Sequence, residues 1–134
     1  MANFVLDSYA LLAYFRKEEG GEKVEQLLNE AVADKHELHM TCINAGEVYY
    51  MAHRKDGADK ATLVWKALQQ FPIHMIEVDM AFTLKAASLK AKYSFSYADA
   101  FAAALAISKK ATLITGDHEF DSLAAETNFK VKYL

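Results

Sequence analysis

The sequence predicts an α/β fold, a three-layer α/β/α sandwich built around a mainly parallel central sheet. Two features indicate this fold class. Short apolar runs typical of strands alternate with longer runs of helical periodicity along the chain. In addition, segment 96–107 carries alanine on every face, which suits a helix packed closely between a sheet and other helices.

The order of the predicted elements follows from this alternation. Pro72 is the only proline, and with Phe71 it ends one helix and begins a strand. Strands are predicted at 3–6, 38–41, 73–78, 111–115 and 129–133. Helices are predicted at 8–15, 22–35, 44–55, 59–70, 79–92, 96–109 and 117–125. Because helices separate consecutive strands, most neighbouring strands are expected to run parallel.

Length and composition narrow the class of protein. The 134 residues predict one domain spanning 1–134, and a content of 53% hydrophobic and 25% charged residues is typical of a globular chain. The net charge of −3 argues against coating of nucleic acid by bulk electrostatics, but catalytic carboxylates also lower the net charge of a nuclease. No apolar run approaches the roughly 20 residues of a membrane span, and no signal peptide is expected. Cys42 is the single cysteine, which excludes an internal disulfide and favours the cytoplasm.

Four acidic residues stand at junctions between predicted elements. Asp7 directly follows the first strand, and Asp117 follows the strand at 111–115. Glu47 and Asp99 are each expected in the first turn of a helix. Ligands of open α/β sheets lie at the carboxyl ends of the strands, so we expect the four carboxylates to converge there.

A convergent group of this kind has a defined chemistry. Two carboxylates about 5 Å apart repel by roughly 3 kcal/mol at an effective dielectric constant near 20, so the group must take up protons or bind a cation. Ligands that are all oxygen favour Mg²⁺ or Mn²⁺ over zinc. A hard cation held in this way can activate water and stabilise a pentacovalent phosphate, and phosphodiester hydrolysis is therefore the expected reaction.

Each acid also has a purely structural interpretation. Asp7 and Asp117 can be N-caps of the helices that they precede. Segments 44–47 and 96–99 both resemble capping boxes, with an acid at the third helical position. The residues alone leave both interpretations open, and the metal site depends on all four acids meeting at one edge.

The same stretches resemble the motifs of PIN domains, most closely those of VapC-type toxins. The resemblance is carried in order by Val5-Leu-Asp-Ser-Tyr-Ala-Leu-Leu-Ala13, Asn44-Ala-Gly-Glu-Val48, Ser96-Tyr-Ala-Asp-Ala-Phe-Ala-Ala-Ala104 and Thr112-Leu-Ile-Thr-Gly-Asp-His-Glu-Phe120. It implies a metal-dependent endoribonuclease that forms a homodimer and is blocked by an antitoxin. The acidic site that it implies consists of Asp7, Glu47, Asp99 and Asp117. Asp7 and Asp99 are expected to bind the metal directly, and the other two directly or through water.

Several assignments stay open in the sequence. Glu119 and Asp121 offer further acids beside Asp117, and Tyr9 can pack or stack on a base. We interpret His36 and His39 as a solvated pair, because no cysteine or further histidine completes a zinc site. Two alternative functions also remain, a PIN-like binding module without turnover and a nuclease directed at DNA, since carboxylates and a metal do not distinguish the sugars.

Overall fold

The computed structural model describes residues 2–134. Five strands form one sheet in the order β3-β2-β1-β4-β5, and every neighbouring pair is parallel. The strands are β1 (Ala2–Leu6), β2 (His36–Thr41), β3 (Ile73–Ile76), β4 (Thr112–Thr115) and β5 (Lys130–Tyr133). The predicted parallel sheet is confirmed, and its five strands lie within two residues of the predicted ends.

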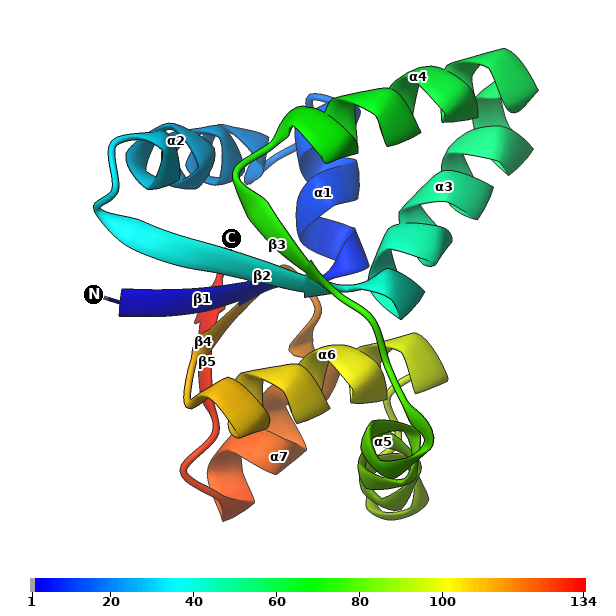
Figure 1. The fold of residues 1–134 in the computed structure, drawn as a ribbon. Coiled ribbons are helices and arrows are strands. Elements are labelled where there is room, and N and C mark those ends of the chain that lie inside the picture. The colour runs from blue at the N-terminus through cyan, green and yellow to red at the C-terminus, as the bar shows by residue number, and fades with distance from the viewer. Residues whose placement is uncertain (1) are drawn as a thin grey trace.

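Helices cover both faces of this sheet, which confirms the three-layer sandwich (Figure 1). One face is covered by α1 (Ser8–Phe15), α2 (Gly21–Val32), α3 (Cys42–Asp56) and α4 (Ala58–Gln70). The other is covered by α5 (Met80–Lys92), α6 (Tyr97–Lys109) and α7 (Asp121–Glu126). The helix predicted at 117–125 is in fact two elements, the 3-10 helix η1 (His118–Phe120) followed by α7.

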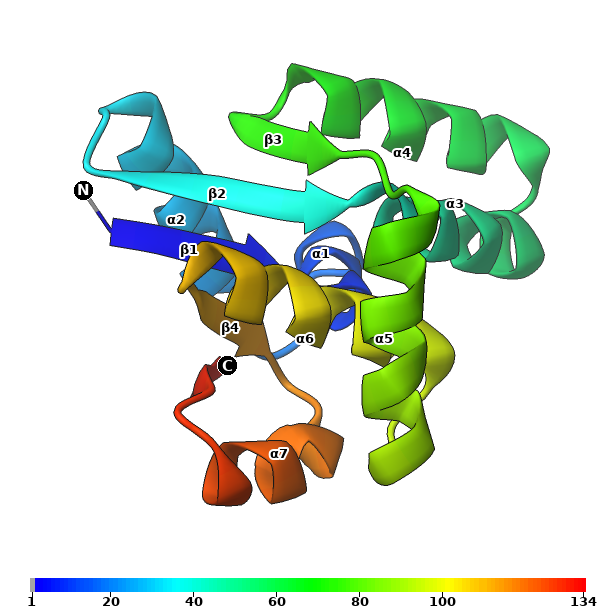
Figure 2. The ribbon, with the colours of Figure 1, turned by 60° about the horizontal axis from the view of Figure 1, so that its bottom comes forward.

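The two faces carry different cores. Leu6 and Ile114 point to the α1–α4 side, whereas their neighbours Val5 and Leu113 point to the α6 side, as the period of two along a strand requires. On the α6 side seven consecutive residues, 100–106, are buried, and five of them are alanine. These small side chains let α6 lie close to the sheet, as Figure 2 shows where it crosses in front of the strands.

The topology determines where the functional edge lies. Because all strands are parallel, their carboxyl ends meet at one edge, and β1 sits between β2 and β4. The starts of α1 and α3 and the loop to η1 follow the ends of these three strands. Helix α6 packs against α3. Among the helices of residues 2–134, none combines the length and apolar character needed to cross a bilayer.

Candidate functional site

The end of β1 places Asp7 inside the protein. Asp7 is the N-cap of α1, and its Oδ1 accepts a hydrogen bond of 2.9 Å from the N–H of Ala10. The residue is only 1% exposed, and its second oxygen, Oδ2, is buried without a hydrogen-bond partner. The capping interpretation is therefore confirmed, but it accounts for one carboxylate oxygen only. An unpaired buried oxygen is costly unless it is protonated or bound by a cation or water.

The charge on Asp7 is strongly disfavoured in the folded protein. Burial raises the pKa of its carboxyl from 3.8 to about 7, although the Thr115 side chain and the Ala10 N–H lower it. The nearby charges of Asp99 and Asp117 raise the pKa further. These three acids, which are far apart in the sequence, therefore lie close enough to repel one another.

Asp99 reaches the same edge from the start of α6. Ser96 and Asp99 form the predicted capping box, in which the Ser96 hydroxyl accepts from the Asp99 N–H at 3.1 Å and Asp99 Oδ2 accepts from the Ser96 N–H at 3.2 Å. Partial burial raises the pKa of the Asp99 carboxyl to about 6, and Asp117 and Glu47 raise it as well. This residue thus links Glu47 electrostatically to the other acids.

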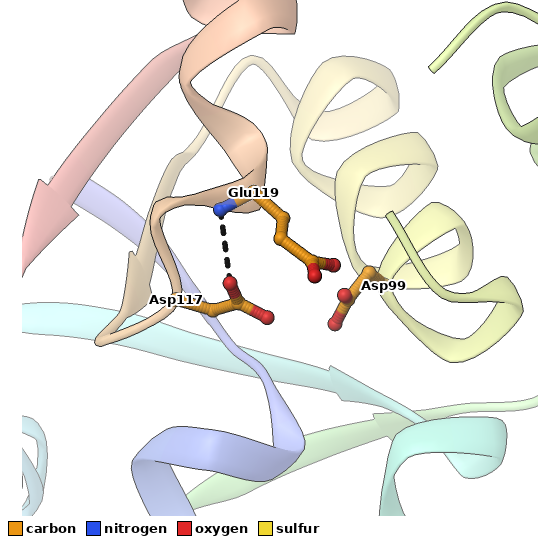
Figure 3. A group of neighbouring side chains, drawn as sticks. All are labelled: Asp99, Asp117 and Glu119. Carbon is orange, nitrogen blue, oxygen red and sulfur yellow. Dashed lines mark hydrogen bonds between the residues drawn. The ribbon is translucent and has the colours of Figure 1, made fainter. Parts of the chain in front are cut away.

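The loop after β4 supplies two more carboxylates. Asp117 caps η1, since its Oδ1 accepts from the N–H of Glu119 at 2.9 Å, and its own N–H donates to the Thr115 hydroxyl at 3.0 Å. One oxygen each from Asp99, Asp117 and Glu119 lie within 4.8 Å of one another. Figure 3 shows the three side chains directed toward a common space between η1 and α6. Glu119, which the sequence left undecided, therefore joins the group.

Asp121, the other undecided acid, turns away from this space. Its Oδ1 accepts a hydrogen bond from the Tyr133 hydroxyl, and its Oδ2 lies 3.4 Å from Nδ1 of His118. The His118 and Tyr133 rings stack with their centroids 4.1 Å apart. Asp121 therefore belongs to a surface contact between α7, η1 and β5.

Glu47 differs from its predicted local structure. Helix α3 begins earlier than expected, with Thr41 as its N-cap, so Glu47 lies in the second turn and 44–47 is not a capping box. The prediction was wrong because the Thr41 hydroxyl, rather than the Asn44 side chain, accepts the bond from the first turn. The charge of Glu47 raises the pKa of Asp99, and its Oε2 lies 3.5 Å from the Tyr50 hydroxyl.

Other residues considered in the sequence have structural partners. The Tyr9 ring is 48% exposed but lies on Gly116, where a Cβ would approach it to 2.1 Å, so Tyr9 packs against the loop that carries Asp117. The prediction that His36 and His39 are solvated is wrong, because both lie in β2 and are buried. Nε2 of His36 donates to the Leu27 carbonyl, because strand β2 starts at His36 rather than at 38. Nε2 of His39, which already lay in the predicted strand, donates to Asn3 Oδ1.

The donor set fits a hard divalent cation. The atoms that face one another are carboxylate oxygens, with no thiolate or imidazole among them, and such oxygens are the ligands that Mg²⁺ and Mn²⁺ prefer. Asp7 lies outside this group of three, but its Oδ2 is buried without a hydrogen-bond partner, and the charges of Asp99 and Asp117 raise its pKa. A cation here would relieve both the repulsion between the acids and the cost of that orphan oxygen.

Comparison with known families agrees with this architecture. The family model of the PIN domain matches residues 4–126. The chain belongs to the PIN domain family. A search of curated protein sequences gave no match.

Solved structures share the fold at low sequence identity. VapBC from Salmonella typhimurium, bound to DNA, aligns with a TM-score of 0.74 at 15% identity, over 99% of this chain and 98% of that chain. VapBC2 from Rickettsia felis, bound to a promoter fragment, gives 0.73 at 15% identity over 98% of each chain. VapC20 from Mycobacterium tuberculosis, a toxin that cleaves the Sarcin-Ricin loop, gives 0.71 at 16% identity over 91% of this chain and 95% of that chain. At these identities the likeness establishes the shared fold.

Proposed function

We propose that this PIN domain is a metal-dependent endoribonuclease whose site consists of Asp7, Glu47, Asp99 and Asp117, joined by Glu119. The observation that carries the proposal is the buried Asp7 carboxylate, with one oxygen unpaired and with Asp99 and Asp117 close enough to raise its pKa. A helix cap needs neither burial nor like-charged neighbours. A cation-binding site produces both.

The residues would divide the work of holding the ion and the water. Asp7 and Asp99, the two acids whose pKa burial raises most, are the proposed direct ligands of Mg²⁺ or Mn²⁺. Asp117, Glu119 and Glu47 would bind directly or through water from the open side. When bound, the metal supplies Lewis acidity toward the phosphate and lowers the pKa of its water.

The carboxylates of the chain would then orient the attacking water and accept its proton. In hydrolysis a water oxygen attacks phosphorus, the bond to the departing sugar oxygen breaks, the water loses a proton and the departing oxygen gains one. Glu47 and Glu119, which make no helix-capping bond, are free to orient the attacking water and accept its proton. Asp7, Asp99 and Asp117 are each fixed by one capping bond, so they would keep their geometry as charge develops.

The biological setting is part of the same proposal. The chain would form one domain over 1–134, act in the cytoplasm as a homodimer and be the toxin partner of a cognate antitoxin. The solved VapBC structures with the same fold support an antitoxin partner. The description of VapC20 as a toxin that cleaves the Sarcin-Ricin loop supports RNA as the substrate class.

The test is cleavage of structured and unstructured RNA, and of DNA, by the wild type and Asp99→Asn with Mg²⁺, Mn²⁺ or EDTA. The amide keeps the shape and much of the capping ability but removes the charge that a metal needs. Asp79→Asn is the matched control. Asp79 also caps a helix, accepting from the Phe82 N–H at 2.9 Å, but does not belong to the acidic group.

Metal-dependent RNA cleavage that is lost only in Asp99→Asn supports the proposal. Equal activity in all three proteins overturns it, because the acidic site would then not be responsible. DNA cleavage without RNA cleavage replaces the substrate class. If neither nucleic acid is cleaved by protein freed of any co-purified antitoxin, the domain is a binding module.

A further inference from the structure

Buried polar side chains gather at the edge of the sheet where the acids lie. Of the seven polar or charged residues that are buried in residues 2–134, five lie at the carboxyl edge of the sheet: Asp7, Ser8, Thr41, Asn44 and Thr115. Asn44 takes part in more hydrogen bonds than any other of these residues. It is 0% exposed, in the first turn of α3.

The side-chain amide of Asn44 and its backbone N–H and carbonyl all have hydrogen-bond partners. Its Nδ2 donates to the Ser8 hydroxyl at 3.3 Å and to the Ala98 carbonyl at 3.1 Å. Its Oδ1 accepts from the Thr41 hydroxyl, and its backbone N–H donates to the same hydroxyl at 3.0 Å. Its backbone carbonyl accepts from the Ser8 hydroxyl at 3.0 Å. A fully satisfied buried network of this kind is rigid, whereas a half-satisfied one is costly.

The partners of Asn44 are the chain neighbours of the acids. Ser8 follows Asp7, and Ala98 precedes Asp99. Asn44 itself is three residues before Glu47 on α3, less than one helical turn. One amide group therefore connects the starts of α1, α3 and α6, which are 36 and 54 residues apart in the sequence.

Only an amide side chain of this length satisfies all three elements. The Ala98 carbonyl needs a donor and the Thr41 hydroxyl needs an acceptor, so a carboxylate would face the carbonyl with an oxygen. An apolar side chain would leave the carbonyl and both hydroxyls without these partners. The network also uses the single proton of the Ser8 hydroxyl, so this hydroxyl cannot donate to a carboxylate or to a phosphate.

We propose that Asn44 is a positioning residue that fixes the starts of α1, α3 and α6 relative to one another, so that Asp7, Glu47 and Asp99 converge. Its effect on metal binding rests on the proposed function, whereas its effect on the three helix starts does not. Asn44 contacts no ligand, and it acts through the elements that carry the acids.

The test compares Asn44→Ala and Ser8→Ala with a packing control. Val48→Ala, also fully buried on α3, weakens the core without touching the polar network. Thr41→Ser keeps the hydroxyl and serves as the conservative variant. Backbone amide hydrogen exchange is measured without metal, below the unfolding temperature of each variant, and Mn²⁺ alone is titrated by calorimetry.

In Asn44→Ala we expect faster exchange at the starts of α1 and α6 as well as α3, and binding of Mn²⁺ weakened about tenfold or more, as for other residues that orient metal ligands. Ser8→Ala, which is less disruptive, should loosen the start of α1 and weaken Mn²⁺ binding in the same direction. Val48→Ala and Thr41→Ser should retain wild-type Mn²⁺ affinity and protection at α1 and α6. The start of α5, which is outside the network, reports any global loss of protection.

Two results overturn the proposal. One is exchange that rises in Asn44→Ala and Ser8→Ala only as much at α1 and α6 as in Val48→Ala. The other is Mn²⁺ affinity in both variants equal to that of the wild type. If the wild type itself binds no Mn²⁺, the proposed function fails, and the exchange data alone still decide whether Asn44 connects the three helices.

Discussion

Two side chains in residues 2–134 bury a polar atom that makes no hydrogen bond, Oδ2 of Asp7 and Nδ1 of His39. Both residues follow or lie in a central strand, and both are at most 5% exposed. Burial raises the pKa of Asp7 to about 7 and lowers the pKa of His39, so the folded protein favours the neutral form of each.

The charges around the two groups distinguish a metal site from a structural residue. Asp99 and Asp117 add negative charge around Asp7, and a cation would relieve all three. His39 as a neutral ring leaves only an uncharged nitrogen, Nδ1, without a partner, because its Nε2 donates to Asn3. In the described residues, one group of acids is close enough to share a metal, Asp99, Asp117 and Glu119; Asp7 lies outside it but is near enough for Asp99 and Asp117 to raise its pKa. Burial alone therefore does not indicate a site, whereas burial among like charges does.

Asp7→Asn should have the largest effect on activity, because it removes the charge but keeps the helix cap. RNA cleavage is expected to fall at least about a thousandfold, since the metal stabilises the transition state by several kcal/mol. Initial rates with saturating Mg²⁺ measure the loss, and circular dichroism checks the fold. Activity within tenfold of the wild type would show that Asp7 is only a cap.

The same substitution should increase the stability of the folded protein relative to the wild type at neutral and higher pH. A carboxyl whose pKa is 3.8 unfolded and about 7 folded contributes stability that is present below pH 3.8 and is lost as the pH rises through 7. The difference corresponds to at most about 4 kcal/mol. In metal-free protein, the stability of Asp7→Asn relative to the wild type should therefore rise by a few kcal/mol between pH 4 and pH 8. Urea unfolding at both pH values measures it, and a constant difference would contradict the electrostatic cost.

Glu119→Gln and Asp121→Asn sharpen the boundary of the acidic group. Glu119 faces Asp99 and Asp117, whereas Asp121 bonds to Tyr133. Mn²⁺ binding should weaken about tenfold in Glu119→Gln, because a ligand charge is lost, and by less than about twofold in Asp121→Asn. Calorimetric titration of both proteins gives the comparison. The reverse order would place the wrong acid in the group.

This pair also marks how far the sequence predicts the site. The alternation of strands and helices predicts the fold, and parallel strands then bring Asp7 and Asp117 to one edge, which Asp99 reaches from the start of α6. The choice between Glu119 and Asp121 depends on how side chains are directed around a 3-10 turn, and a helix was predicted there instead. Residue spacing also gave no sign of Asn44 as a connecting group, because its partners Ser8 and Ala98 are distant in sequence.

The prediction that His36 and His39 are solvated was wrong for a different reason. A polar residue near a predicted helix end is usually solvated, but β2 begins two residues earlier than predicted, and this turns His36 into a strand residue, whereas His39 already lay in the predicted strand. Helix α6 and the neighbouring strands then cover His39. Its burial is therefore a tertiary effect, decided by the elements that pack on β2 rather than by local sequence.

The smallest expected effect concerns this second buried group. Burial, Lys109 on α6 and His74 on β3 all lower the pKa of His39 below 6.5, and only Glu37 opposes them. A histidine whose folded pKa is depressed contributes stability that is present above pH 6.5 and is lost as the pH falls below it. His39→Gln should therefore flatten the loss of stability between pH 7.5 and pH 5 without changing RNA cleavage or Mn²⁺ binding. Urea midpoints at the two pH values measure the slope, with the exposed His53→Gln as control. If His39→Gln instead weakened Mn²⁺ binding, the distinction between a buried site and a buried structural group would fail.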